Sequence, residues 1–196
     1  MNNEDPRDDF LARARGVRGD PEGPFVERSR QGGLERLTYH SLDLGNVDLT
    51  GACLRGVRLV ECDLSDAILV DCDTRGTQLI RCNLSRTRLV SNRGFSRVQQ
   101  CFGTGADWSD SLLESTPFIG VNFEGFSFEN ARMTRVRFTE SELLDCKFAG
   151  ATLDGLFSRD TAFVAPTGWS GPPDGADVDS STVQRSTPEL FEPTLS

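Results

Sequence analysis

The sequence predicts an all-β parallel solenoid, a narrow rod in which the chain turns once every five residues. Three observations support this fold class. A large apolar residue recurs every fifth position in two runs, a smaller residue lies two positions before it, and Gly, Asn or Asp often lies two positions after it. A helix would spread such a pattern around all its sides, because five residues advance it by about 140°. A continuous strand alternates its faces with period two, so an odd spacing does not fit it either.

The first run covers 42–91, from LDLGN to TRLVS. We call the large apolar residue of each unit its centre, and the smaller residue two positions earlier its partner. Centre and partner point the same way on a short extended segment, so both are expected to face the axis. The centres of this run are Leu44, Leu49, Leu54, Leu59, Leu64, Leu69, Thr74, Leu79, Leu84 and Leu89.

The second run covers 106–155, from ADWSD to ATLDG. Its centres include several aromatic residues, which we expect to fill the axis rather than to form a base-stacking platform. They are Trp108, Leu113, Phe118, Phe123, Phe128, Met133, Phe138, Leu143, Phe148 and Leu153. In both runs the position two after the centre is rich in Gly, Asn and Asp, which accept the backbone angles of tight turns.

The motif A(D/N)LXX, present here as VDLTG, CDLSD, CNLSR and VNFEG, resembles the repeat of the pentapeptide-repeat family. The resemblance covers about residues 37–157. It implies a right-handed quadrilateral parallel β-helix with four units per coil, in which equivalent residues stack every twenty positions. This span corresponds to about six coils and, at ~4.8 Å per strand, to a rod roughly 30 Å long.

The two runs are out of phase by one residue, because Leu89 and Trp108 are nineteen positions apart where a coil needs twenty. We expect a register slip within 92–105, centred on 92–95, where Gly94 stands in place of a Leu. Ser96 and Val98 already fit the second phase. A second irregularity is expected at 103–105, where another centre is Gly.

The predicted organisation is a flexible segment 1–24, a capped β-helix 25–165 and a disordered tail 166–196 rich in Pro, Gly, Ser and Asp. Solenoid ends need caps, because an end coil exposes its core. The candidates at the first coil are Phe25, Val26, Leu34, Leu37 and Tyr39. Those at the last coil are Leu156, Phe157, Phe163 and Trp169.

The formal net charge of −9 argues against a general nucleic-acid binder, which usually carries a basic footprint. No stretch reaches the ~18 apolar residues of a membrane span, and the acidic start resembles no secretory signal. We therefore expect a cytoplasmic protein without a membrane partner. Its six cysteines are then expected to be free thiols rather than disulfides.

No catalytic, cofactor or metal site is predicted. Cys62, Cys72, Cys82 and Cys146 occupy partner positions, where a free Cys acts as a small apolar residue, and only Cys53 faces outward as a candidate reactive thiol. His40 is the single histidine, and a Ser-His-Asp or Cys-His site would have to use it. Neither phosphate-binding glycine motif occurs.

The outward charges carry the functional prediction. The second run is acidic by five charges, and its acids form the candidate interaction surface: Asp107, Asp110, Glu114, Glu124, Glu129, Glu140, Glu142, Asp145 and Asp154. We expect a non-enzymatic interaction scaffold with a protein partner, as a monomer or an end-to-end homodimer. Part of the family mimics DNA, so the resemblance implies an alternative, in which acids bind a type II topoisomerase such as gyrase in place of phosphates. A continuous negative stripe would favour this alternative.

Overall fold

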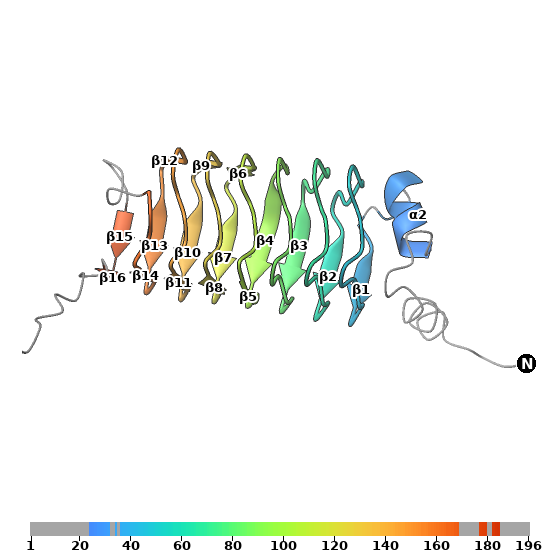
Figure 1. Ribbon diagram of the computed structural model, residues 1–196, viewed down its shortest axis with the longest axis horizontal. Coiled ribbons are helices and arrows are strands. Elements are labelled where there is room, and N and C mark those ends of the chain that lie inside the picture. The colour runs from blue at the N-terminus through green and yellow to red at the C-terminus, as the bar shows by residue number, and fades with distance from the viewer. Residues whose placement is uncertain (1–23, 32–33, 35, 169–176, 180–181, 185–196) are drawn as a thin grey trace, which may run out of the picture.

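The computed structural model describes residues 24–31, 34, 36–168, 177–179 and 182–184. These residues form a rod of short parallel strands stacked along one axis, with helix α2 (Pro24–Gln31) against the end where β1 lies (Figure 1). Within this described part, no helix has the length and apolarity needed to cross a bilayer.

The rod has four sides, which we number in the order in which the chain visits them. Face 1 is a continuous parallel sheet along the rod. Its strands, in order, are β1 (Thr38–His40), β2 (Arg58–Val60), β3 (Thr77–Ile80), β4 (Phe95–Gln99), β7 (Pro117–Ile119), β10 (Arg137–Thr139), β13 (Phe157–Arg159) and β15 (Asp177–Asp179). Six successive pairings link β1 to β13, in agreement with the predicted number of coils.

The other three sides repeat the same stacking. Face 2 holds β5 (Phe102–Thr104), β8 (Asn122–Glu124), β11 (Glu142–Leu144), β14 (Ala162–Val164) and β16 (Thr182–Gln184). Face 4 holds β6 (Leu112–Glu114), β9 (Arg132–Thr134) and β12 (Thr152–Asp154). Face 3 is built from single bridges, which run from Asp48 through Asp107 to Thr167. The predicted quadrilateral parallel β-helix is therefore confirmed.

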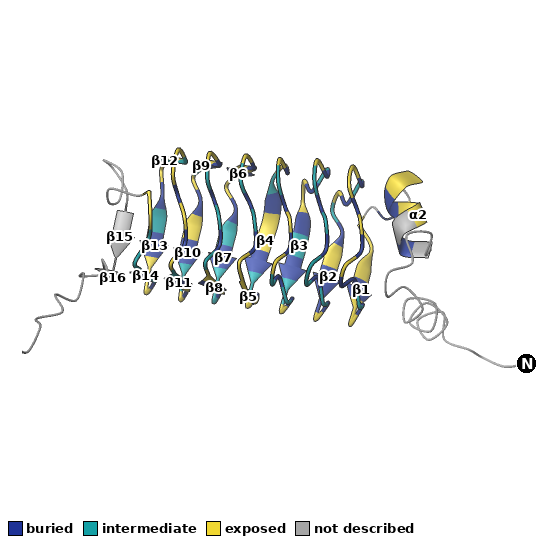
Figure 2. Ribbon diagram, viewed as in Figure 1, coloured by how far each residue is buried: buried dark blue, intermediate teal, exposed yellow. Residues whose placement is uncertain are grey.

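Centres and partners fill the axis as predicted, so buried and exposed residues alternate along each side (Figure 2). The phenylalanines of consecutive coils stack: Phe118 on Phe138 at 4.8 Å between ring centroids, and Phe128 on Phe148 at 5.3 Å. Such stacked pairs add to the area that each ring buries.

Polar partner residues are also explained by the stacking. The Thr87 hydroxyl donates to the Leu64 carbonyl at 2.8 Å, and the Ser111 hydroxyl donates to the Leu89 carbonyl at 2.7 Å. Each bond satisfies a buried polar group and ties one coil to the previous one.

The corners are the positions two after each centre, and they adopt the left-handed conformation with φ from about 50° to 76°. Gly, Asn and Asp at many of these positions accept it readily, as predicted. The same angle is imposed on less suited residues such as Arg81, Gln100 and Arg135. The continuous ladders on either side fix these corners whatever their residue type.

The register slip lies at 92–95, within the predicted range. Corners normally follow one another every five residues, but here Ser91 is followed by a corner at Gly94 and then by one at Gln100. Strand β4 is correspondingly longer than its neighbours, and its pairing with β3 shifts by one residue after Thr77. Phe95 turns inward and packs its ring 5.1 Å from that of Trp108.

Two expectations about this region were wrong. Ser96 is exposed, and the buried position before Val98 is taken by Phe95, whose larger ring packs against Trp108. No second irregularity occurs at 103–105: Gly103 lies within β5 and pairs with Phe123 in the regular register.

The end caps follow the prediction in part. Phe25 and Leu34 are buried and the Phe25 ring meets Tyr39 edge-on at 5.1 Å, whereas Leu37 is exposed. At the other end Leu156 and Phe163 are buried, but Phe157 lies half-buried on the outside of face 1. The predicted segment 1–24 lies outside the described residues except for Pro24, as does Trp169.

Two short strands lie within the segment 166–196, which was predicted to be disordered. Within it, β15 pairs with β13 and β16 pairs with β14, each at the twenty-residue spacing. Their backbone groups continue the ladders of faces 1 and 2, which requires no large apolar side chains. The remainder of the tail beyond Gly168 lies outside the described residues.

Candidate interaction faces

The strand positions of faces 1 and 2 carry opposite charges. Between β1 and β13, face 1 has arginines and no acidic residue at these positions: Arg58, Arg97, Arg137 and Arg159. Between residues 43 and 164, face 2 has acids and no basic residue: Asp43, Asp63, Glu124 and Glu142. Two adjacent sides of one rod therefore present opposite potentials to a partner.

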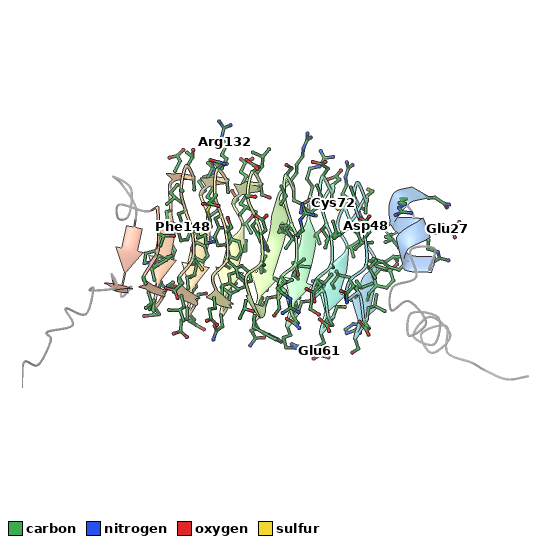
Figure 3. All side chains as sticks on the ribbon, in the orientation of Figure 1. Glu27, Asp48, Glu61, Cys72, Arg132 and Phe148 are labelled. Carbon is green, nitrogen blue, oxygen red and sulfur yellow. The ribbon has the colours of Figure 1, made fainter. Side chains whose placement is uncertain are left out.

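Face 3 extends the acidic surface, whereas face 4 is mixed. Faces 2 and 3 and the corner between them carry nine acids in total. Four are the acids of face 2 named above, and the other five are Asp48, Asp66, Asp107, Glu129 and Asp145. They carry three basic residues, Arg86, Arg88 and Lys147. On face 4 basic residues such as Arg93 and Arg132 alternate with acids such as Glu114, and Arg132 projects away from the rod (Figure 3).

The nine acids predicted as one surface are divided between the sides of the rod. Glu124, Glu142, Asp145, Asp107 and Glu129 lie on faces 2 and 3 and their shared corner. Asp110 lies on the next corner, Glu114 and Asp154 lie on face 4, and Glu140 lies on the corner between faces 1 and 2. The structure thus brings five of them together and separates the other four.

Several acids of the first run have a structural role. Asp43, Asp48 and Asp63 each accept a hydrogen bond from the backbone N–H two residues later, at 3.2, 2.9 and 2.9 Å. Asp107 does the same at 3.0 Å in the second run. Such bonds stabilise the turn that follows, which explains Asp and Asn at this position independently of function.

The described ion pairs hold arginines of the corners and of face 4. Asp73 binds Arg55 at 2.7 Å and Arg75 at 2.5 Å, and Arg135 binds Glu114 at 2.7 Å. Arg81 and Arg86 pair with the acids one coil earlier, Glu61 and Asp66. Among these pairs none involves an arginine at a strand position of face 1.

Arg58 and Arg97 of face 1 have neutral neighbours instead. Arg58 donates from Nε to the Gln78 side chain at 3.0 Å, and Arg97 donates to the Gln99 side chain at 3.0 Å. The Arg159 guanidinium lies 5.5 Å from the centroid of the Phe157 ring. These contacts orient the three side chains, and Arg58 and Arg97 have no carboxylate at ion-pair distance among the described residues.

The buried cysteines act as core residues. Cys72 donates its thiol hydrogen to the Leu49 carbonyl at 3.0 Å, and Cys82 donates to the Leu59 carbonyl at 3.5 Å. Burial raises the pKa of Cys72 to about 11 and that of Cys146 to about 12, so both remain thiols at neutral pH. Cys53 is half-buried on face 4, as the predicted register placed it.

His40 is exposed at the end of β1 on face 1. In the described part of the chain, no group of three or more His, Cys, Asp or Glu side chains is arranged to hold a metal ion.

The arginines of face 1 were missed in the sequence. Arg58, Arg97 and Arg137 are 39 and 40 residues apart, which is two coils once the slip is counted. The row spans both runs, and its members fall at one position of face 1 only when the one-residue slip is counted.

Comparison with known proteins places the repeats in a family. The pentapeptide-repeat family matches the chain in eight copies over residues 43–73, 58–91 and 118–155. No curated protein sequence matches it significantly.

Solved structures with a similar course of the chain include QnrB1, a plasmid-mediated fluoroquinolone resistance protein. It is 14% identical over 76% of this chain and 84% of that chain, with a TM-score of 0.40. Rfr23, a pentapeptide repeat protein from the cyanobacterium Cyanothece 51142, is 19% identical over 74% of this chain and 87% of that chain, with a TM-score of 0.36. HetL from Nostoc sp. strain PCC 7120, a protein involved in heterocyst differentiation regulation, is 16% identical over 81% and 92%, with a TM-score of 0.21.

Proposed function

This chain belongs to the pentapeptide-repeat family, and we propose that it is a non-enzymatic scaffold for protein interaction. The observation that carries the proposal is the sorting of exposed charge by side on a regular rod. Charge arranged in this way selects partners by electrostatic complementarity and accelerates their encounter. We further propose that the protein acts in the cytoplasm, where its buried thiols stay reduced.

Faces 2 and 3 are the proposed primary docking surface, for a partner with a basic surface. Glu124, Glu142 and Asp145 are exposed and lie close together on neighbouring coils. Their side chains stand on a backbone held by the ladder of face 2, so little ordering is required on binding.

The test is the capture of partners on the immobilised protein, followed by affinity measurement with each purified partner. The variant Glu124→Gln/Glu142→Gln/Asp145→Asn should weaken a genuine partner about tenfold or more. The control variant Glu114→Gln/Glu140→Gln/Asp154→Asn removes the same charge from other sides of the rod and should retain binding. A partner that binds both variants equally, or the absence of any saturable partner, would refute the proposed surface.

A second candidate function is mimicry of DNA toward a type II topoisomerase. It is favoured by the excess of nine acids over three basic residues on faces 2 and 3 and their shared corner. The row is interrupted on face 2, where Asn83, Phe102 and Asn122 stand between Asp63 and Glu142.

Gyrase supercoiling assays with the purified protein, with and without a fluoroquinolone, test this candidate. Inhibition or protection that is lost in the variant with altered Glu124, Glu142 and Asp145 would support mimicry. No effect at micromolar protein would exclude it and leave the general scaffold role in place.

A further inference from the structure

We propose that face 1 is a second docking surface, which binds an acidic amphipathic helix of a partner protein. The inference rests on the proposed scaffold role but concerns another side of the rod. Its basis is a row of arginines beside a row that carries three aliphatic residues.

The arginine row has a regular spacing. Arg58, Arg97 and Arg137 occupy the same strand position in β2, β4 and β10, and all three are exposed. β3 lies between the first two strands and β7 lies between the second two. Two steps of the ladder separate neighbouring arginines by about 9.6 Å.

The charge of this row is available to a partner. The hydrogen-bond acceptors of Arg58 and Arg97 are the neutral amides of Gln78 and Gln99. Arg137 has no ion-pair partner among the described residues. This differs from the corners and from face 4, where carboxylates already neutralise several arginines.

The neighbouring row carries three aliphatic residues, with Gln99 between Ile80 and Ile119. Val60, Ile80 and Ile119 lie two residues after the arginine position in β2, β3 and β7, and Pro117 lies between Arg97 and Arg137 in the arginine row itself. Ile80, Pro117 and Ile119 remain partly accessible. A ligand on face 1 therefore meets cations along one line and aliphatic side chains along a parallel line.

These dimensions fit a helix better than an extended segment. Carboxylates at every seventh residue of a helix lie on one side and about 10.5 Å apart, within reach of flexible arginines spaced about 9.6 Å. An extended segment presents side chains on one side only at every second residue, at about 6.8 or 13.6 Å, and neither value matches. Apolar residues three and four positions from each carboxylate would then contact the aliphatic row.

Charge complementarity favours an acidic protein over nucleic acid. Face 2 and the corner with Glu140 border face 1 on the side of the aliphatic row, and this anionic edge opposes a broad polyanion such as a duplex. A narrow helix with its carboxylates on one side can place them over the arginine row, away from this anionic edge.

The probe is a labelled 18-residue helical peptide with Glu at positions 1, 8 and 15 and Leu on the adjacent stripe, measured by fluorescence anisotropy at low and high salt. A matched peptide has Gln in place of the three Glu. We expect the acidic peptide to bind at least tenfold more tightly than the Gln peptide, and added salt to reduce the difference.

Protein variants identify the face. Arg58→Gln/Arg97→Gln/Arg137→Gln should weaken binding of the acidic peptide at least tenfold. Arg88→Gln/Arg93→Gln/Arg132→Gln removes the same charge from faces 3 and 4 and should change it less than twofold. If the first triple variant unfolds at a lower denaturant concentration than the native protein, Arg137→Gln alone should still reduce binding at least twofold.

Three results would overturn the inference: no measurable binding of the acidic peptide, equal losses in the two triple variants, or tighter binding of duplex DNA than of the peptide through the same arginines. The acidic-face variant used to test the scaffold proposal should bind the peptide normally. Failure of one proposal can therefore be distinguished from failure of the other.

Discussion

The side-chain carbonyl of Asn92 accepts a hydrogen bond of 2.8 Å from the backbone N–H of Cys72, twenty residues earlier. The Asn92 amide also donates to the Leu69 carbonyl at 2.7 Å. The buried Asn92 side chain thus bridges two backbone groups at a corner of the coil that precedes the slip. In regular coils the equivalent N–H bonds directly to the carbonyl, as Ala52 does to Leu49.

Asn92→Ala should therefore be more destabilising than its small change in volume suggests. The substitution leaves the Cys72 N–H and the Leu69 carbonyl buried without their present partners, and each such loss costs about 1–3 kcal/mol. We expect a decrease of about 2–4 kcal/mol in the free energy of unfolding by urea. Arg93→Ala, on the exposed neighbour, is the control, and a similar small effect of both changes would contradict the assigned role.

The two glycines near the slip should respond differently to Ala. A Cβ on Gly103 would lie 2.7 Å from the Ser85 nitrogen and 2.8 Å from the Leu84 carbonyl carbon, so β5 would have to move. A Cβ on Gly94 meets nothing within 4 Å, but its φ of 55° costs an L-residue about 1 kcal/mol. Urea unfolding should rank Gly103→Ala as the more harmful change, and the reverse order would be inconsistent with these contacts.

The inward and outward positions can be compared directly. Phe128 is fully buried between Trp108 and Phe148, and Phe128→Ala should cost about 3–5 kcal/mol. Arg58 is exposed on face 1, and Arg58→Ala should change stability by about 0.5 kcal/mol or less. Equal effects in thermal or urea unfolding would refute the register.

Asp73 should make stability depend on pH. Hydrogen bonds from Arg75 and Arg55 hold its pKa well below the usual value of about 3.9. Because the folded pKa is the lower one, the stabilisation is present above about pH 4 and is lost as the pH falls toward the folded value. The stability difference between the native protein and Asp73→Asn should be largest at neutral pH and should shrink in acid. A difference that is constant from pH 7 to acid would be incompatible with this ion-paired arrangement.

Thiol chemistry should distinguish Cys53 from the buried cysteines. Burial keeps Cys72 and Cys146 protonated at neutral pH and prevents access to their sulfur atoms. We expect a chromogenic aryl disulfide to react with one thiol in the folded protein and with all six in denaturant. Cys53→Ser should remove the fast reaction, whereas fast labelling that survives this change would reveal an opening of the core.

The fold was predictable because one rule governs every coil. Five-residue spacing fixed the inward residues from Leu44 to Leu153, and the corner residues marked where the chain turns. The sequence located the slip but did not predict its geometry. Only the packing of the core shows that Phe95 rather than Ser96 turns inward. The strands at 177–184 were missed although Val178 and Val183 continue the twenty-residue spacing from Ser158 and Phe163.

The candidate site was less predictable for a related reason. The repeat leaves outward positions free to vary, so no local motif marks a binding residue. The arginine row becomes visible only when Arg58, Arg97 and Arg137 are assigned to the same side, which requires the slip to be placed correctly first.

The slip also changes the number of residues that separates equivalent positions on one side of the rod. Leu44 and Leu64 occupy the same place in successive coils, as do Leu84 and Gly103, although the first pair is twenty residues apart and the second is nineteen. A coil can be removed without moving the following residues to other sides of the rod only if the deletion has the right length. That length is twenty residues within either run and nineteen residues across 92–95. Natural or engineered exchange of coils between the two halves is consequently restricted to junctions that respect this count. A deletion that is one residue too long or too short would turn the core residues of every following coil toward solvent.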